Sequence, residues 1–220
     1  MKRNYRNSGL IDQKKLKEIA VIGAGSIGST IIQDLAMMGY DKIVIVDNDI
    51  VAIHNLSTTR YPEDFIGSAK VEAAKYMCNL LNHNIEIETI LSSVENWMEN
   101  GLQANVIMAT DTMHSRKAIY KKWLENDSRV ALIDIRMASM VIERIVTTKY
   151  NDHFMNYYKP DSEIPDEPCT MKHTVFTTSI ASGLAVTGLF SILSNRAYFE
   201  YIYMGLSPLI VKKELFVKGI

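Results

Sequence analysis

Short apolar runs alternate with longer amphipathic segments along the first two thirds of the chain. The runs are rich in Ile and Val and end at glycine or acidic residues, which is typical of buried parallel strands, whereas the longer segments place apolar residues at helical spacing. Strands are predicted over residues 18–22, 42–46, 85–90, 105–110 and 129–134, and helices over 26–38, 68–81 and 112–125. This alternation predicts an α/β fold: a Rossmann-like, mostly parallel sheet with helices on both faces.

The pattern changes after residue 140. Residues 140–148 predict an added antiparallel strand, and residues 151–172 hold three of the five prolines among several acidic residues. Such a segment indicates a loop over the surface, and long loops in compact domains are often functional. An apolar segment at 174–195 and a strand-like tail at 209–217 follow. We therefore expect a single domain over residues 1–220, with a core (1–150), a crossover-type loop (151–173) and a C-terminal helix and strand (174–220).

The apolar segment 174–195 contains no charged residue and is long enough to span a bilayer. It is also rich in Ser and Thr and carries Gly183 and Gly188. These small and hydroxylated residues favour a buried helix of a soluble core, or a helix packed in a dimer interface, over a membrane span.

Composition narrows the class of protein. Hydrophobic residues make up 47% of the chain and charged residues 22%, as in a soluble globular protein. With 24 Lys and Arg against 25 Asp and Glu, the net charge of -1 supplies no general field for nucleic acid or anionic lipid. Two cysteines, Cys78 and Cys169, cannot build a disulfide framework. Because the N-terminus is also polar and lacks the apolar stretch of a signal peptide, we expect a cytoplasmic protein.

A glycine motif lies between the first predicted strand and the first predicted helix. Gly23, Gly25 and Gly28 fit the pattern GxGxxG, in which glycines allow a tight turn and the helix N-terminus offers amide groups to a phosphate. Asp47 ends the next strand, where a carboxylate can accept hydrogen bonds from ribose hydroxyls. The motif indicates a nucleotide but does not separate NAD from ATP, and a glycine turn without a ligand is the structural alternative.

The residues after Asp47 resemble the ThiF/MoeB/HesA family, which is related to the ubiquitin-activating enzymes. The resemblance covers about residues 10–143 and rests on the segments 47–56, 67–71 and 109–112. As in the family, an Asn, here Asn55, follows Asp47 by eight positions. The resemblance implies an enzyme that uses ATP to adenylate the C-terminal carboxylate of a ubiquitin-like or sulfur-carrier protein, and that forms a homodimer.

The resemblance also implies roles for individual residues. Asp47 would hold the ribose, Asn55 would bind near the ribose and phosphates, Lys70 would neutralise the triphosphate, and Asp111 would anchor Mg²⁺. Asp49 falls within the same nucleotide-binding segment. Each has a structural alternative: Asp111 could cap the helix that follows, Lys70 could face solvent, and Asn55 could serve a turn.

The chain departs from the family pattern at a residue that matters for catalysis. Many members carry an arginine three positions after the Asn, and here that position is Thr58. The interval from Asn55 to Lys70 is one residue shorter than in the sulfur-carrier branch. Arg60 is the first candidate for the missing cation, Arg136 is a second, and Arg6 from a partner subunit is a third. A further difference is Ser26, at a position where the family often has Gly.

Many relatives carry paired CxxC motifs for a structural zinc, and this chain has none. The histidines are scattered without ligand spacing, so we expect no structural zinc: His54, His83, His114, His153 and His173. Cys169 is a candidate for a thioester with the activated carrier, with an inert cysteine as the alternative. Cys78 is predicted to lie in the core.

Together these observations predict an adenylyltransferase that uses ATP and Mg²⁺ on the C-terminus of a small protein or peptide. Two alternatives stay open. An NAD(P)-dependent oxidoreductase would explain the glycine motif and Asp47, but would leave Asn55, Lys70 and Asp111 without a role. A nucleotide-binding docking partner that does not catalyse would explain Thr58.

Overall fold

The computed structural model describes residues 6–164 and 174–218. These residues form an eight-stranded sheet in the order β3-β2-β1-β4-β5-β6-β7-β8. The strands are β1 (Glu18–Ile22), β2 (Lys42–Asp47), β3 (Glu86–Leu91), β4 (Asn105–Met108), β5 (Ala131–Ala138), β6 (Val141–Thr148), β7 (Tyr198–Leu206) and β8 (Leu209–Val217). The helices are α1 (Ser26–Met38), α2 (Lys70–Leu81), α3 (Val94–Trp97), α4 (Met113–Leu124) and α5 (Val175–Leu193).

Strands β1 to β5 run parallel, and β6, β7 and β8 continue the sheet antiparallel to their neighbours. The predicted α/β architecture is therefore confirmed, together with the added antiparallel strands. Strand β7 was not predicted from the sequence. It pairs with β8 as a hairpin, and its burial does not follow a clean period of two, because Glu200 and Gly205 are its two buried residues.

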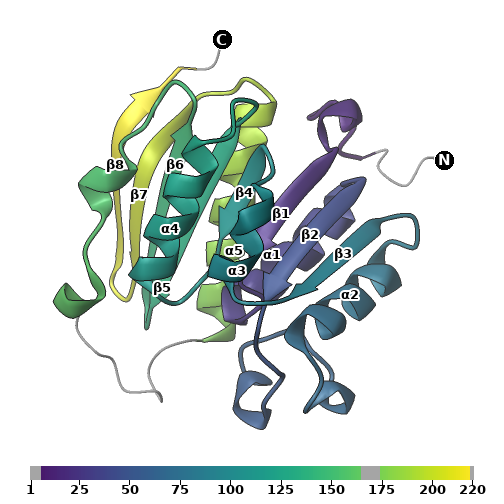
Figure 1. The fold of residues 1–220 in the computed structure, drawn as a ribbon. Coiled ribbons are helices and arrows are strands. Elements are labelled where there is room, and N and C mark those ends of the chain that lie inside the picture. The colour runs from purple at the N-terminus through teal and green to yellow at the C-terminus, as the bar shows by residue number, and fades with distance from the viewer. Residues whose placement is uncertain (1–5, 165–173, 219–220) are drawn as a thin grey trace.

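Helices cover the sheet in two layers (Figure 1), and each layer has its own apolar core. Alternate residues of one strand face opposite layers: Ile19 and Val21 of β1 pack with α1, α2 and α5, whereas Ala20 and Ile22 pack with α3 and α4. Strands buried on both faces explain why the apolar runs in the sequence are continuous.

Helix α5 is the predicted apolar segment, and it packs on α1 and on strands β5 and β6. By length and composition alone it is, within the described residues, the one helix that could cross a membrane, and 44% of its apolar 18-residue window is buried inside the fold. A Cβ at Gly188 would lie 3.2 Å from Arg144 Nη1 in β6, so the glycine allows close approach to the sheet. Ser182 donates to Asp34 Oδ2 of α1 at 2.5 Å. This hydroxyl thus ties α5 to α1.

Several predicted boundaries differ from the structure; strand β5, for example, runs over Ala131–Ala138 rather than 129–134. Helix α2 begins at Lys70 rather than at residue 68, because Ala69 is extended and forms a bridge with Ile50. Strand β4 ends at Met108, two residues earlier than predicted, and leaves Thr110 and the residue after it in the connection to α4.

Candidate functional site

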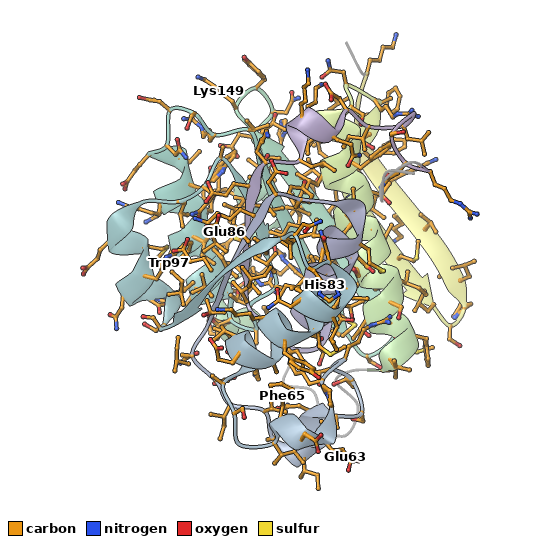
Figure 2. The ribbon with its side chains drawn as sticks, turned by 90° about the vertical axis from the view of Figure 1, so that its right-hand side faces the viewer. Glu63, Phe65, His83, Glu86, Trp97 and Lys149 are labelled. Carbon is orange, nitrogen blue, oxygen red and sulfur yellow. The ribbon has the colours of Figure 1, made fainter. Side chains whose placement is uncertain are left out.

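The order of the sheet reverses between β1 and β4, so the connections that leave these neighbouring strands go to opposite sides of the sheet. Ligands of open parallel sheets bind at the carboxyl ends of strands at such a point. The glycine motif follows β1, and Thr110 and Asp111 follow β4. Figure 2 shows that the segment with Glu63 and Phe65 extends beyond this edge, at the opposite end of the molecule from Lys149.

Two of the three motif glycines are required by the fold itself. Gly23 has φ +95°, and a Cβ there would lie 2.6 Å from the Ala109 carbonyl oxygen. A Cβ at Gly28 would lie 1.9 Å from the Gly23 carbonyl oxygen, because the first turn of α1 packs directly on the loop. These two positions explain the tight strand-to-helix turn without any ligand.

Gly25 is different, because a Cβ there would meet nothing within 4 Å. It is the N-cap residue of α1, and no side chain caps the amide groups of the first turn. Amide groups at a helix N-terminus, with the partial positive charge of the helix dipole, fit a phosphate group. The open space over Gly25 therefore fits a nucleotide phosphate.

Asp47 anchors the loop beside this space. Its Oδ2 accepts a hydrogen bond from the Ala24 amide at 2.6 Å, and its Oδ1 accepts one from the Asp49 amide at 2.8 Å. Burial raises the pKa of Asp47, while the charge of Lys70 and the two amides act in the opposite direction. Each carboxylate oxygen retains a further lone pair, so the group can also accept ribose hydroxyls.

Lys70 is buried, so the alternative of a solvent-facing lysine is wrong. Its Nζ donates to Asp49 Oδ2 at 2.7 Å, and its backbone amide donates to the Asp49 carbonyl at 2.9 Å. The ammonium group lies close enough to Asp47 to affect the pKa of that carboxyl. The structure therefore brings Asp47, Asp49 and Lys70 together.

Asn55 serves a turn, as its structural alternative predicted. Its Oδ1 accepts from the Ala52 amide at 2.9 Å. In the same segment the hydroxyls of Thr58 and Ser26 lie 2.9 Å apart, so the two residues that depart from the family pattern contact each other. This contact ties the segment after β2 to the start of α1.

Arg60 binds hydroxyls of α1 and α5. Its Nε donates to Thr30 Oγ1 at 3.3 Å, and its Nη2 donates to Ser179 Oγ of α5 at 3.1 Å. A role for Arg60 on the phosphates would require the exposed side chain to exchange these hydroxyl partners for phosphate oxygens. Arg6 is exposed near the start of the described chain.

Asp111 is exposed in the connection between β4 and α4. The N-cap of α4 is Thr112, whose hydroxyl accepts from the Ser115 amide at 3.1 Å, so the alternative of Asp111 as the helix cap is wrong. Asp161 supports this turn from the loop after β6, accepting from the amides of Met113 at 2.7 Å and His114 at 3.0 Å. The Asp111 carboxylate thus stays accessible to a ligand.

A buried charge network lies beneath this turn, and the sequence analysis missed most of it. Asp134 of β5 is 1% exposed and accepts from Arg116 of α4 and from Arg136 of β5. Arg136 also donates to the Tyr157 carbonyl at 2.7 Å, so its guanidinium is engaged on two sides. The sequence offered one signal of this network: Asp134 falls inside a predicted buried strand, where a carboxylate needs a charged partner.

The cysteine and metal predictions are tested only in part. Cys169 lies outside the described residues. Cys78 is buried in the core as predicted, and burial raises the pKa of its thiol to about 12. Within residues 6–164 and 174–218, His, Cys, Asp and Glu form no group of three or more arranged to hold a metal ion. A single carboxylate such as Asp111 fits Mg²⁺, because this ion keeps waters and substrate oxygens in its coordination shell.

The sequence of this chain is similar to those of known proteins. The model of the ThiF family matches residues 1–207. Ubiquitin-like modifier-activating enzyme 5 of Drosophila mojavensis is 30% identical over 126 residues, which cover 50% of this chain and 32% of that protein. The match thus spans about a third of the length of this curated relative.

Solved structures of MccB from E. coli share the fold. MccB with ATP is 16% identical, with a TM-score of 0.72 over 94% of this chain and 66% of that chain. MccB with AMPCPP and MccA is 15% identical, with a TM-score of 0.75 over 99% of this chain and 72% of that chain. Identities this low show the fold alone.

Proposed function

The chain belongs to the ThiF family, and from this premise we propose that it is an adenylyltransferase that uses ATP to activate the C-terminal carboxylate of a small protein or peptide. The observation that carries the proposal is the open space over Gly25, at the same sheet edge as Asp47, Lys70 and Asp111. A nucleotide whose phosphates bind at the α1 N-terminus would have Asp47 beside it as an acceptor for the ribose hydroxyls and Lys70 beside it as a cation.

The proposed reaction joins two anions, so cations should dominate its rate. A carboxylate oxygen attacks the α-phosphorus, an acyl–phosphate bond forms, and the bond from the α-phosphorus to the oxygen of the β-phosphate breaks. Pyrophosphate leaves with that electron pair. Lys70 would neutralise phosphate oxygens, and Asp111 would hold Mg²⁺, which neutralises charge on the phosphates when bound. Asp47 would orient the ribose, and Asn55 would act near it.

The partner is proposed from the relatives. One relative is named for activating a ubiquitin-like modifier, and MccB was solved with MccA. Both fit a substrate that presents a free C-terminal carboxylate. A homodimer is part of the proposal, since the resemblance implies one, and sedimentation equilibrium of the purified chain tests it.

Exchange of labelled pyrophosphate into ATP tests the reaction. We expect Mg²⁺-dependent exchange, and we expect it to increase when the carrier is added. The carrier to test is a small protein that ends in Gly-Gly and is encoded by a neighbouring short reading frame. Asp111→Asn should abolish the exchange, and Asp64→Asn, an exposed aspartate in the segment after β2, should not. ATP binding without exchange in the presence of the carrier would contradict catalysis, and tight NADH binding would contradict the nucleotide assignment.

A second candidate function is a nucleotide-binding docking partner without catalysis. Two observations favour it: Thr58 occupies the position of the family arginine, and Arg60 binds Thr30 and Ser179. Pyrophosphate exchange by the wild-type chain separates the two functions, because a docking partner catalyses none. Where exchange is found, Arg60→Ala tests whether Arg60 supplies the missing cation. A large fall in exchange assigns the missing cation to Arg60, and an unchanged rate removes Arg60 from the site.

A further inference from the structure

The peptide group that joins Thr110 to Asp111 is held from below by a buried arginine. Arg116, which is 4% exposed, donates from Nη2 to the Thr110 carbonyl oxygen. This carbonyl belongs to the peptide group whose nitrogen is that of Asp111. Because β4 ends at Met108, this residue pair lies beyond the ladder of the sheet.

Arg116 binds groups of the protein itself. Its Nη1 donates to Asp134 Oδ1 and to the Ile135 carbonyl at 3.1 Å, and burial excludes its guanidinium from the ligand space. A buried planar guanidinium whose two terminal nitrogens both bind the protein fixes geometry rather than binding a mobile phosphate. The positive charge of Arg116 still interacts electrostatically with the exposed carboxylate of Asp111.

Asp134 is itself held, which makes Arg116 a rigid support. The Oδ2 atom of Asp134 accepts from Arg136 Nε at 2.9 Å and Nη2 at 2.7 Å. A buried carboxylate between two arginines has its charge compensated, and both of its oxygens accept hydrogen bonds. The network therefore connects the buried middle of β5 to the peptide group between Thr110 and Asp111.

We propose that Arg116 is a positioning residue that holds Asp111 in the orientation in which it binds the Mg²⁺ of the ATP complex. The inference rests on the proposed function, because it takes Asp111 as the magnesium ligand. Residues that orient a metal ligand through hydrogen bonds change metal affinity by about 10-fold to 100-fold when they are removed.

Arg116→Lys tests this, because it keeps the charge and loses the fork that reaches Asp134 and the Thr110 carbonyl together. Arg144→Lys is the matched control. Arg144 is 3% exposed and donates to the carbonyls of Leu184 at 3.3 Å and Phe199 at 2.6 Å, away from the ends of the parallel strands. Both substitutions remove a buried guanidinium that binds backbone carbonyls.

The readout is the affinity for ATP by calorimetry, measured with Mg²⁺ and with EDTA, together with the Tm of each variant. In Arg116→Lys we expect the gain in affinity from Mg²⁺ to fall by about 10-fold, with unchanged affinity in EDTA. In Arg144→Lys we expect a lower Tm and an unchanged gain from Mg²⁺.

A lower Tm with an unchanged gain in Arg116→Lys would overturn the inference and leave Arg116 a structural residue. If Arg116→Lys does not fold, Arg136→Lys tests the same network with less disturbance of the core, since Arg136 is partly accessible. Full retention of the Mg²⁺-dependent gain in ATP affinity by Arg136→Lys would then overturn the inference. If wild-type protein shows no gain from Mg²⁺, the proposed role of Asp111 fails and the inference fails with it. If the wild-type protein gains affinity for ATP from Mg²⁺ and the variants keep the whole of that gain, the inference about Arg116 fails while the proposed role of Asp111 stands.

Discussion

Lys70 and Asp49 form an ion pair of 2.7 Å in which the lysine side chain is 10% exposed and the aspartate side chain is 63% exposed. The exposed partner can move away from the lysine at little cost, because an exposed carboxylate is well solvated. The buried ammonium group, by contrast, stays where the start of α2 places it. Asp49 thus holds a cation at the sheet edge in the absence of a phosphate.

Removing the ammonium group should affect catalysis far more than folding. Lys70→Met keeps the apolar stem. It leaves Asp49 exposed to solvent and Asp47 with its two amide donors, so we expect a change in stability of about 1 kcal/mol. Pyrophosphate exchange should fall by about 100-fold, as when one group that stabilises developing charge is removed. Lys17→Met is the control, since Lys17 forms an ion pair of 2.8 Å with Asp41 on the surface. Equal rates in the two variants would contradict the role of Lys70.

Gly25 should tolerate a side chain in the free protein but not in the nucleotide complex. Gly25→Val places the side chain in open space at an ordinary φ of -78°, so the Tm should remain within a few degrees of the wild-type value. Affinity for ATP, measured by calorimetry, should be lost. Gly183→Ala is the control at another open position, and Gly28→Ala should unfold the protein because its Cβ would clash with the Gly23 carbonyl. ATP binding by Gly25→Val would contradict the phosphate site.

The raised pKa of Asp47 predicts how ATP affinity depends on pH. The ionised carboxylate accepts hydrogen bonds, and a pKa above the ordinary value means that protonation begins at a higher pH than for an exposed aspartate. Affinity should therefore decrease as the pH is lowered from 7, and Asp47→Asn should lose this component. Because ATP itself titrates identically with both proteins, the difference between their calorimetric profiles reports Asp47. Parallel profiles would contradict its role at the ribose.

Asp161 should stabilise the protein by capping α4 from a distant loop. Its carboxylate accepts from two amides of the first turn, so Asp161→Ala should cost about 1 kcal/mol in the free energy of unfolding measured with urea. Glu163→Ala, in the same helical turn, should leave that free energy unchanged, because the side chain is exposed. A loss of the same size in both variants would mean that the loop, rather than the cap, is responsible.

Local pattern was sufficient for the parallel part of the fold. The strand over β1 and the helix α1 agree with their predicted bounds, because β-branched runs and helical spacing report burial directly. The glycine motif was equally readable, since Gly23 and Gly28 are required by contacts within a few residues of sequence or with the adjacent strand. Strand β7 escaped prediction, because its burial does not follow a period of two.

The state of each site residue depended on tertiary structure. Residue type and spacing identified Lys70 and Asp111, but the burial of Lys70 comes from the packing of α2 and its pairing with Asp49. Likewise, Thr112 rather than Asp111 caps α4, which only the backbone geometry decides. Arg116 and Asp134 meet only because α4 returns to pack on β5. Sequence thus determined which groups are available and the order of the parallel strands and their helices, because those depend on near neighbours. Burial, partners and some strand ends depend on segments that only the folded chain brings together.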